Sequence, residues 1–320
     1  MAWCLRPLPL QARKRVTALP IGMTTTVFHA GFFFLVPVGK AWFTGAGCSE
    51  ARSSVIVTNC ICIKYGTLYG PEYVNRLFAG LRRNTRSEVR MFCMTDDAEG
   101  LDRRIEILSL PEEPFHEQMF AAMQSAPKRG RMQKVSLFRP DLVPDLEGPM
   151  MVFDIDIVIT GNIDELRDYA PGKVCMRLEW TRSGKAPVLG HGSVERFDPD
   201  LHGYLYEFMA REPERAVTMG GGSEQSYTSI CAREHGDFEP YPEQWIVSFK
   251  HHCRPARPFN LILEPHLPPD ARVVCFHGRP KMTEAVEGYR PNILHRTRPC
   301  SWLKNAWLGA RTGNETAEHP

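Results

Sequence analysis

Two aspartates lie within a long apolar segment of the chain. Residues Met150–Thr160 read Met-Met-Val-Phe-Asp-Ile-Asp-Ile-Val-Ile-Thr, a pattern typical of an interior strand of a parallel sheet. Asp154 and Asp156 are two residues apart, so their side chains leave the same face of an extended chain. Buried carboxylates without partners are costly, and neighbouring ones repel each other. The pattern therefore favours a divalent cation at the carboxyl end of this strand, where open α/β sheets bind their ligands.

Two other arrangements would also accommodate this pair. Arginine side chains or backbone N–H groups could hold the carboxylates, or the strand could end there and leave them exposed. Full burial of an aspartate without a partner is rare, so we expect the cation.

The composition is that of a soluble globular protein. A chain of 320 residues suits one large α/β domain with or without appendages. The hydrophobic fraction is 43% and the charged fraction 24%, both ordinary values. The formal net charge of +2 gives no reason to expect nucleic acid as a partner. The 10 cysteines are scattered and form no Cys-x-x-Cys pair, which favours reduced, buried thiols in a cytoplasmic protein.

The first fifty residues differ from the rest. Four basic residues between Arg6 and Arg15 precede the apolar run Val27–Val38, an order that resembles a signal or anchor segment. The run is short for a membrane span and contains His29 and Pro37. We therefore predict that residues 1–50 are an extension, poorly ordered or leader-like, or an over-long gene model. The catalytic domain is expected at 51–290, followed by a C-terminal helix and tail at 291–320.

Strands and helices alternate from Ser54 onward. Apolar runs predict strands at 55–62, 89–94, 105–108 and 150–160, and helical spacing predicts helices at 72–81 and about 132–138. Shorter strands are expected at 174–178, 190–197 and 272–276, and the glycine-rich loop 220–226 runs into a helix. This alternation predicts an α/β fold with a mixed, mostly parallel sheet flanked by helices.

The strand at 272–276 delivers the sequence His277-Gly278-Arg279-Pro280-Lys281. A histidine at a strand end is a suitable third ligand for Mn²⁺, which accepts imidazole as well as carboxylate. Gly278 allows backbone N–H groups to approach phosphate oxygens, and Lys281 adds a cation. Taken alone, His277 is more commonly an ordinary loop histidine. Together with the aspartate pair, it predicts a site for a metal and a diphosphate.

The aspartate pair also fits a second class of enzyme. Residues Asp154–Val158 satisfy the Asp-x-Asp-x-Thr/Val signature of the Mg²⁺-dependent phosphatases of the haloacid-dehalogenase type. In that chemistry Asp154 is a covalent nucleophile and Asp156 a general acid and base. Such phosphatases usually carry this strand near the N-terminus and an acidic pair further along. Here the strand comes late and no clear acidic pair follows, so a metal clamp is favoured and the phosphatase stays an alternative.

Four segments in order resemble a known family. They are Val57–Asn59 with Tyr65-Gly66, then Thr95–Asp97, Phe153–Asp156 and Phe276–Lys281. Together they resemble a GT-A fold nucleotide-sugar glycosyltransferase, similar to glycosyltransferase family eight and its bacterial relatives. The resemblance spans about Ser54 to Tyr289. Its most specific parts are the Asp-x-Asp strand followed by Thr160–Leu166, and the His-Gly-x-x-Lys sequence.

The resemblance implies roles for matching residues in donor binding. Asp154, Asp156 and His277 would bind Mn²⁺ (or Mg²⁺), which would hold the diphosphate of the donor as a leaving group. Lys281 and Gly278 would contact that diphosphate. The nucleoside pocket would be lined by three residues near the first strand and faced by an aspartate: Thr58, Asn59, Tyr65 and Asp96.

Other matching residues are implied beside the donor sugar. Lys134 would contact the sugar or its phosphates. The turn Gly222-Ser223-Glu224-Gln225 resembles the Asp-Gln turn of the family, which makes Glu224 and Gln225 candidate catalytic residues together with Lys281. His191-Gly192-Ser193 stands where relatives carry an Asn-Ser pair. For Lys134, Glu224 and Gln225 the alternative is ordinary solvated surface.

The expected reaction is transfer of a sugar from a nucleotide-sugar, which the resemblance implies is a UDP-sugar, to a hydroxyl of a glycan or lipid-linked acceptor. Positioning and electrostatics would carry the catalysis, and the resemblance implies retention of anomeric configuration. A non-catalytic nucleotide-sugar binding protein is a further alternative. The expected location is the cytoplasm, with possible peripheral contact at the inner membrane face. Basic residues and two tryptophans in His295–Leu308 would rest on the membrane, or form a helix that packs on the domain.

Overall fold

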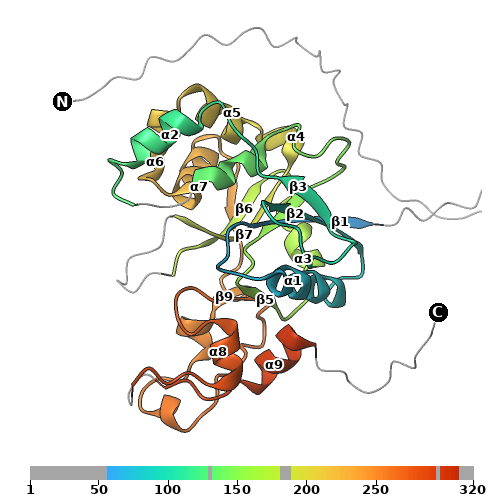
Figure 1. Cartoon of the computed structure of the whole chain (residues 1–320), viewed down its shortest axis with the longest axis vertical. Coiled ribbons are helices and arrows are strands. Elements are labelled where there is room, and N and C mark those ends of the chain that lie inside the picture. The colour runs from blue at the N-terminus through green and yellow to red at the C-terminus, as the bar shows by residue number, and fades with distance from the viewer. Residues whose placement is uncertain (1–55, 129–131, 181–188, 293–295, 310–320) are drawn as a thin grey trace, which may run out of the picture. The chain divides into compact units, whose positions relative to one another are not determined.

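The described residues all belong to one compact unit. Within it, the computed structural model describes residues 56–128, 132–180, 189–292 and 296–309 (Figure 1). The extension expected at residues 1–50 lies outside the described residues. Among the described helices, none combines the length and the apolar character that crossing a bilayer requires.

A seven-stranded sheet forms the centre of the described chain. Its strand order is β3-β2-β1-β4-β7-β6-β8, and within it only β7 runs antiparallel to its neighbours. The strands are β1 (Val57–Lys64), β2 (Glu88–Thr95), β3 (Glu106–Ser109), β4 (Met150–Phe153), β6 (Val174–Leu178), β7 (Gly190–Phe197) and β8 (Phe238–Pro240). The predicted fold class, a mixed and mostly parallel sheet flanked by helices, is confirmed. Because β2 and β4 lie on opposite sides of β1, the strand order reverses between β1 and β4.

A second, three-stranded sheet corrects the prediction of one continuous strand at 150–160. It consists of β5 (Ile157–Ile159), β10 (Val273–Cys275) and β9 (Ile246–Ser248), in the order β5-β10-β9. The chain leaves the large sheet after Phe153 and enters the small one at Ile157, so residues 154–156 form a bend. Asp154 and Asp156 therefore do not share one face of an extended strand. The bend leaves both carboxylates partly exposed, whereas the apolar residues on each side of it are buried.

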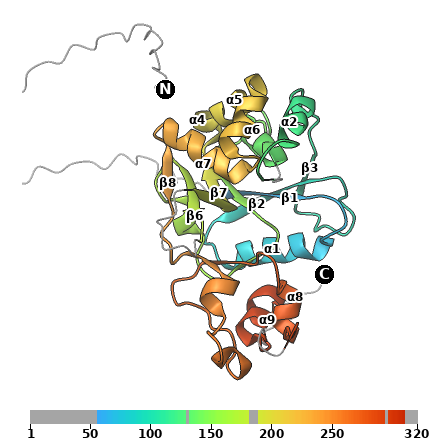
Figure 2. The same cartoon turned by 90° about the vertical axis from the view of Figure 1, so that its left-hand side faces the viewer.

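Helices cover both faces of the large sheet (Figure 2). Alternate residues of β1 belong to different cores, Cys60 and Cys62 to one and Ile61 to the other. The first core packs against α1 (Pro71–Arg83), α8 (Met282–Glu287) and α9 (Ser301–Leu308). The second packs against α2 (His116–Met123), the 3₁₀ helix η1 (Met132–Phe138), α5 (Tyr204–Arg211), α6 (Pro213–Gly220) and α7 (Glu224–Glu234). The remaining short elements are α3 (Asp164–Arg167), α4 (Pro199–His202), the π-helix η2 (Phe249–Cys253) and the 3₁₀ helix η3 (Phe259–Leu261).

The helix α1 illustrates why these elements form. Pro71 occupies the first turn, where its missing N–H costs nothing, and Glu72 beside it suits the positive end of the helix dipole. Tyr73, Val74, Leu77, Phe78 and Leu81 form the buried stripe. The helix was predicted at 72–81 from this spacing, and that prediction is confirmed.

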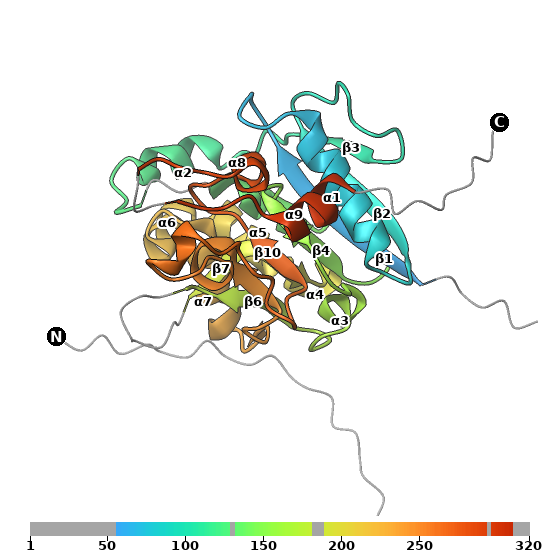
Figure 3. The ribbon, with the colours of Figure 1, turned by 90° about the horizontal axis from the view of Figure 1, so that it is seen from below.

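The C-terminal helix α9 packs along α1 (Figure 3). Leu303 and Trp307 are buried in the same core as α1, and the Trp307 ring lies 5.5 Å from that of Tyr73. Trp302 Nε1 donates a hydrogen bond of 3.1 Å to the Pro265 carbonyl. Both tryptophans are thus engaged in packing, as in the second of the two arrangements expected for this segment.

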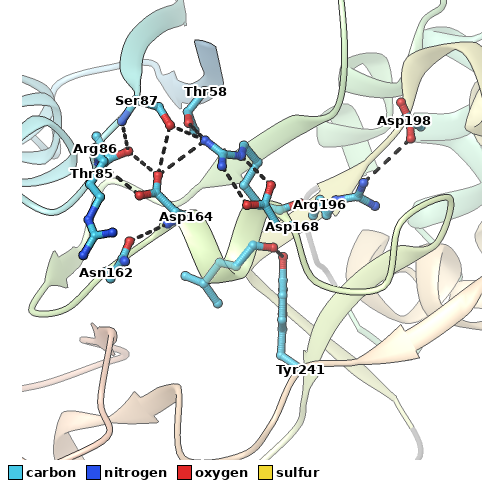
Figure 4. Close-up of polar contacts among 12 residues, drawn as sticks. Thr58, Thr85, Arg86, Ser87, Asn162, Asp164, Asp168, Arg196, Asp198 and Tyr241 are labelled. Atoms are coloured by element: carbon cyan, nitrogen blue, oxygen red, sulfur yellow. Dashed lines mark hydrogen bonds and ion pairs between the residues drawn. The ribbon is translucent and has the colours of Figure 1, made fainter. Parts of the chain in front are cut away.

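A partly buried polar network surrounds Asp164 at the opposite end of the sheet from the bend (Figure 4). Its carboxylate accepts hydrogen bonds from the Thr85 hydroxyl, from the Arg86 N–H at 3.0 Å and from the Ser87 hydroxyl at 3.2 Å. Although burial acts to raise the pKa of Asp164, these hydrogen bonds lower it below the ordinary value. Arg167 joins the network through Ser87 and Asp164. The conspicuous sequence Thr160–Leu166 therefore has a structural role, since it fixes the loop between α1 and β2.

Replacing Asp164 with alanine is expected to lower the free energy of unfolding by about 2–4 kcal/mol, because three hydrogen bonds to a charged group are lost. Urea unfolding measures this. Asp141→Ala is a matched control, since Asp141 pairs with Arg139 at 2.8 Å but is 79% exposed, and we expect a change below about 1 kcal/mol. Equal effects of the two substitutions would show that the network contributes no more than a surface ion pair.

Candidate active site

A cavity of about 920 Å³ opens where β1, β2 and β4 end. This is the point at which the strand order reverses, and open α/β sheets bind ligands at such points. The volume suits a cofactor or substrate of moderate size. The lining comes from the β1–α1 loop, η1, the bend after β4, and the start of α7, and includes Tyr65, Gly66, Thr67, Leu68, Tyr69, Gln133, Lys134, Asp154, Asp156, Gly192, Ser223, Glu224 and Gln225.

Asp156 forms a three-membered polar cluster on one wall of the cavity. Its Oδ2 accepts a hydrogen bond of 2.9 Å from the Tyr69 hydroxyl and lies 3.1 Å from Lys281 Nζ. Lys281 also donates to the Tyr69 hydroxyl. Burial, and next the charge of Asp154, raise the pKa of Asp156. The structure therefore brings the predicted residues Asp156 and Lys281 together, although they are far apart in sequence.

Lys134 lies among carboxylates on the adjoining wall. Its Nζ is 3.4 Å from Asp154 Oδ1 and 3.0 Å from Glu195 Oε1, and it donates to the Gly192 carbonyl. Burial alone would lower the pKa of Lys134, but the carboxylates of Asp154, Glu195 and Glu224 raise it well above its ordinary value. One ammonium group thus lies among three carboxyl groups. The cluster of Lys134, Asp154, Glu195 and Glu224 therefore carries excess negative charge unless one carboxyl group is protonated or another cation binds.

Glu224 and Gln225 begin α7 and belong to the cavity wall. Glu224 is 5% exposed and accepts a hydrogen bond of 2.8 Å from the Thr228 hydroxyl. Burial, followed by the charge of Glu195, raises the pKa of Glu224 to about 8, so its carboxyl group is largely protonated at neutral pH. Gln225 accepts from the Gly192 N–H at 3.0 Å and donates to Glu179 Oε1 at 3.0 Å. Neither residue is ordinary solvated surface.

Glu224→Gln is expected to flatten the pH dependence of stability. Because the pKa of Glu224 is raised to about 8 from about 4.3 in an unfolded chain, its contribution is full at acid pH and is lost as the pH rises through that interval. Glutamine stays neutral and keeps an acceptor for Thr228. Relative to wild type, the variant should gain roughly 1–3 kcal/mol between about pH 5 and pH 8. Urea unfolding across this range measures the difference, and parallel profiles would contradict it.

His277 lies in an aromatic cluster. Its Nε2 is 2.6 Å from the Ser248 hydroxyl, and its ring stacks on Trp180 at 5.2 Å and on His251 at 5.4 Å. Burial, with the charge of neighbouring His251, lowers the pKa of His277 to about 4. Within the described ranges, no three His, Cys, Asp or Glu side chains converge in a way that could hold a metal. The structure does not bring His277 into a triad with the two aspartates, and its role as third ligand stays a prediction.

The two aspartates themselves fit a divalent cation. Asp154 Oδ2 and Asp156 Oδ1 accept no hydrogen bond from the part of the chain that the structure describes, while the other oxygen of each has a lysine within 3.4 Å. Carboxylate oxygens are the ligands that Mg²⁺ and Mn²⁺ prefer. Each aspartate also has a cationic partner without a metal, because a lysine lies beside it. This matches the alternative left open by the sequence, in which basic side chains hold the carboxylates, with lysine in place of arginine.

The nucleoside-pocket residues divide into two groups. Tyr65 lines the cavity, and Asp96 accepts a hydrogen bond of 3.1 Å from the Gly66 N–H, which holds the same loop. The placement of Thr58 and Asn59 beside a nucleoside is corrected. Because β1 extends from Val57 to Lys64, both residues lie near its start and away from the cavity.

The contacts of Thr58 and Asn59 agree with this correction. Arg167 donates a hydrogen bond of 2.7 Å to the Thr58 hydroxyl, and Asn59 Nδ2 donates to the Glu147 carbonyl at 2.8 Å. The strand was predicted at 55–62 and lies at Val57–Lys64, so both residues were inside the strand in either case, and only the family resemblance had assigned them to the nucleoside. Gly278 follows β10 with a positive φ of 80°, and it is not among the residues that line the cavity.

Three residues of the site were missed in the sequence. Glu195 is 1% exposed within β7, but that strand reads Gly-His-Gly-Ser-Val-Glu-Arg-Phe, so it carries no signal of a charge inside an apolar run. Tyr69 and Glu179 carry no such signal, since a tyrosine in a loop and a glutamate after a strand are ordinary. Their partners, Asp156 and Gln225, become neighbours only through the tertiary fold.

Comparison with known proteins finds likeness in structure only. No protein-family model matches the chain, and no curated protein matches it in sequence. The galactosyltransferase LgtC in complex with donor and acceptor sugar analogs is similar with a TM-score of 0.49 and 10% identity, over 81% of this chain and 98% of that chain. Mouse xyloside xylosyltransferase 1 gives a TM-score of 0.43 and 11% identity, over 70% and 98%. The glycosyltransferase GlyE of Streptococcus pneumoniae gives 0.44 and 11%, over 70% and 56%. At such similarity, function has to be argued from the side chains of the cavity.

Proposed function

We propose that this protein is a metal-dependent glycosyltransferase that moves a sugar from a nucleotide-sugar, specifically a UDP-sugar, to an acceptor hydroxyl. The observation that carries the proposal is the cavity at the strand reversal, with Asp154 and Asp156 on its wall and a lysine beside each. Anions reach such a site only if cations offset the carboxylates. Two aspartates with free oxygens and an adjacent lysine suit a metal-bound diphosphate.

Different residues of the cavity would contact the nucleobase, the diphosphate and the sugar of the donor. Tyr65, 41% exposed at the end of β1, offers a ring on which a nucleobase can stack. Asp154 and Asp156 would hold Mn²⁺ or Mg²⁺, which when bound offsets the charge that develops on the departing diphosphate. Lys281 donates hydrogen bonds to Asp156 and to the Tyr69 hydroxyl, which fixes its direction, and in this proposal it would also donate to the diphosphate.

The sugar lies toward α7 in this proposal. A protonated Glu224 can donate a hydrogen bond to a sugar hydroxyl, and Gln225 is fixed by its bonds to Gly192 and Glu179. Lys134 holds Asp154 and Glu195 in place instead of contacting the phosphates. These groups act by positioning and electrostatics, and retention of anomeric configuration follows only from the family that the sequence resembles.

The acceptor in this proposal is a hydroxyl of a glycan or of a lipid-linked saccharide. A cytoplasmic location is supported by the cysteines of the described chain, all of which are free and buried. Lipid-linked acceptors are made and used at membranes, which fits peripheral contact with the inner face.

Assay of turnover tests the proposal against its alternatives. The purified protein is incubated with Mn²⁺, a panel of UDP-sugars and mixed glycan acceptors, and UDP release and glycoside formation are followed. A parallel incubation with Mg²⁺ and a panel of phosphomonoesters follows the release of phosphate. Release of UDP with formation of a glycoside is the expected result. Hydrolysis of a phosphomonoester without UDP release would identify the phosphatase. Saturable UDP binding with no product from any donor would identify a non-catalytic binding protein.

A further inference from the structure

A short segment around η3 exposes three large apolar side chains next to each other. Phe259 is 55% exposed, Ile262 70% and Leu263 50%, whereas the polar Asn260 between them is 3% exposed. A water-facing loop ordinarily shows the reverse arrangement. The segment, which we call the apolar tip (residues 259–263), belongs to the orange part of the chain at the lower end of Figures 1 and 2.

The apolar tip is a built feature of the fold. The Asn260 side chain donates a hydrogen bond of 2.9 Å to the Arg296 carbonyl and thereby holds the tip against the segment 289–298. The backbone is satisfied locally, since Ile262 N and Leu263 N both donate to the Phe259 carbonyl, at 3.0 and 2.8 Å. A segment whose N–H groups are bonded internally can enter an apolar phase at lower cost than an open loop.

Arginines without ion-pair partners among the described residues occur in the segment of the apolar tip and in the segment that Asn260 contacts. The segments 254–264 and 289–298 contain one acidic residue, Glu264, which accepts hydrogen bonds from Ser301. They contain five arginines: Arg254, Arg257, Arg290, Arg296 and Arg298. Burial lowers the pKa of Arg254. The charge of nearby Arg257 lowers it further, whereas Tyr289 acts to raise it. No carboxylate of the described chain lies within ion-pair distance of these five residues. Arg257 and Arg290 are exposed, whereas Arg254 and Arg298 have buried Nε atoms. The tip therefore combines exposed apolar side chains with two exposed arginines that no ion pair within the described chain neutralises.

We propose that the apolar tip docks on the surface of an anionic lipid bilayer. Phe259, Ile262 and Leu263 enter the boundary between headgroups and acyl chains, and the arginines contact lipid phosphates. Nucleic acid also presents phosphates to the arginines, but it offers no apolar environment for the aliphatic side chains of Ile262 and Leu263. This surface is separate from the tryptophans of α9, which pack inside the domain, and it does not depend on the chemistry of the cavity.

Vesicle flotation of the full-length protein tests this surface. Binding is compared between vesicles of phosphatidylcholine alone and vesicles that also contain phosphatidylglycerol. Wild type should bind the anionic vesicles. The triple substitution Phe259→Ser, Ile262→Ser and Leu263→Ser should reduce that binding at least about tenfold. Arg257→Gln with Arg290→Gln should reduce it roughly 25-fold, because each basic residue near the surface contributes about fivefold.

Matched controls separate the tip from general surface effects. Leu201→Ser removes a side chain that is 58% exposed on α4, and Arg103→Gln removes an exposed arginine away from the tip; both should bind as wild type does. Melting temperatures of all variants should agree, since the substituted side chains are exposed. Undiminished vesicle binding by the triple variant would overturn the proposal. The proposal would also be overturned if sedimentation without vesicles showed a dimer that the triple substitution dissociates. Tight DNA binding that only the arginine variant loses would likewise contradict it.

Discussion

Replacing Lys134 with methionine is expected to lower the free energy of unfolding by about 3–5 kcal/mol, because removal of one partner leaves buried charge uncompensated. Lys134 is the cation nearest to Asp154 and Glu195, and Glu195 is 1% exposed on a central strand. Methionine has a similar length and fills the space. The cost is therefore electrostatic, and it should decrease at low pH, where the carboxyl groups take up protons.

A second substitution tests whether the stability lost in Lys134→Met has an electrostatic cause. In the double variant with Glu195→Gln, the buried carboxylate nearest to the missing ammonium is absent, and roughly half of the lost stability should return. Urea unfolding of the wild type, both single variants and the double variant completes the cycle. Strictly additive effects would mean that Lys134 and Glu195 are not coupled, and would remove this pair from the account of the site.

Asp156→Ala is expected to abolish the part of UDP binding that depends on Mn²⁺, a loss of at least about 10–100-fold in the enhancement that the metal gives. Asp156 offers one free oxygen toward the cavity, and alanine removes it. Lys281 then loses its carboxylate partner at 3.1 Å and still attracts the diphosphate, so weak UDP binding without metal should remain. Calorimetric titrations with and without Mn²⁺ separate these two contributions.

Tyr69→Phe is the matched control for Asp156→Ala. It removes only the hydroxyl that bonds to Asp156 and Lys281 and leaves both charges in place. Metal-dependent binding should persist with an affinity reduced by less than about tenfold. If Asp156→Ala kept the full metal enhancement, the aspartate pair would be a structural feature tied by its two lysines, and the metal clamp would be wrong.

Sequence patterns predicted the elements best where one period was unambiguous. The helix α1 occurs where apolar periodicity placed it, and the strands at 174–178 and 190–197 occur at the predicted residues. The break between β4 and β5 was not predictable, because both halves are apolar and only the sheet that each joins distinguishes them. The short helices α4 to α6 were missed, since eight residues or fewer give too little periodicity to separate a helix from a loop.

The site was predicted where charge and burial conflict. Asp154, Asp156 and Lys281 were found because acidic residues inside an apolar run, or a cation after a strand, need partners. Residues that depend on a distant partner, such as Tyr69 with Asp156 or Glu179 with Gln225, gave no signal. Thr58 and Asn59 were assigned to the nucleoside pocket by the family resemblance alone, and β1 continues past them to Lys64 before it reaches the cavity.

Titration of UDP into the full-length protein, with and without Mn²⁺, tests the central claim most directly. The claim is that Asp154 and Asp156 hold a metal that binds the diphosphate of a nucleotide-sugar in the cavity at the strand reversal. The account predicts saturable binding that is at least about tenfold tighter with Mn²⁺, with UMP, which lacks the diphosphate, showing little dependence on the metal. Equal affinity for UDP with and without Mn²⁺, or no binding in either condition, would contradict it.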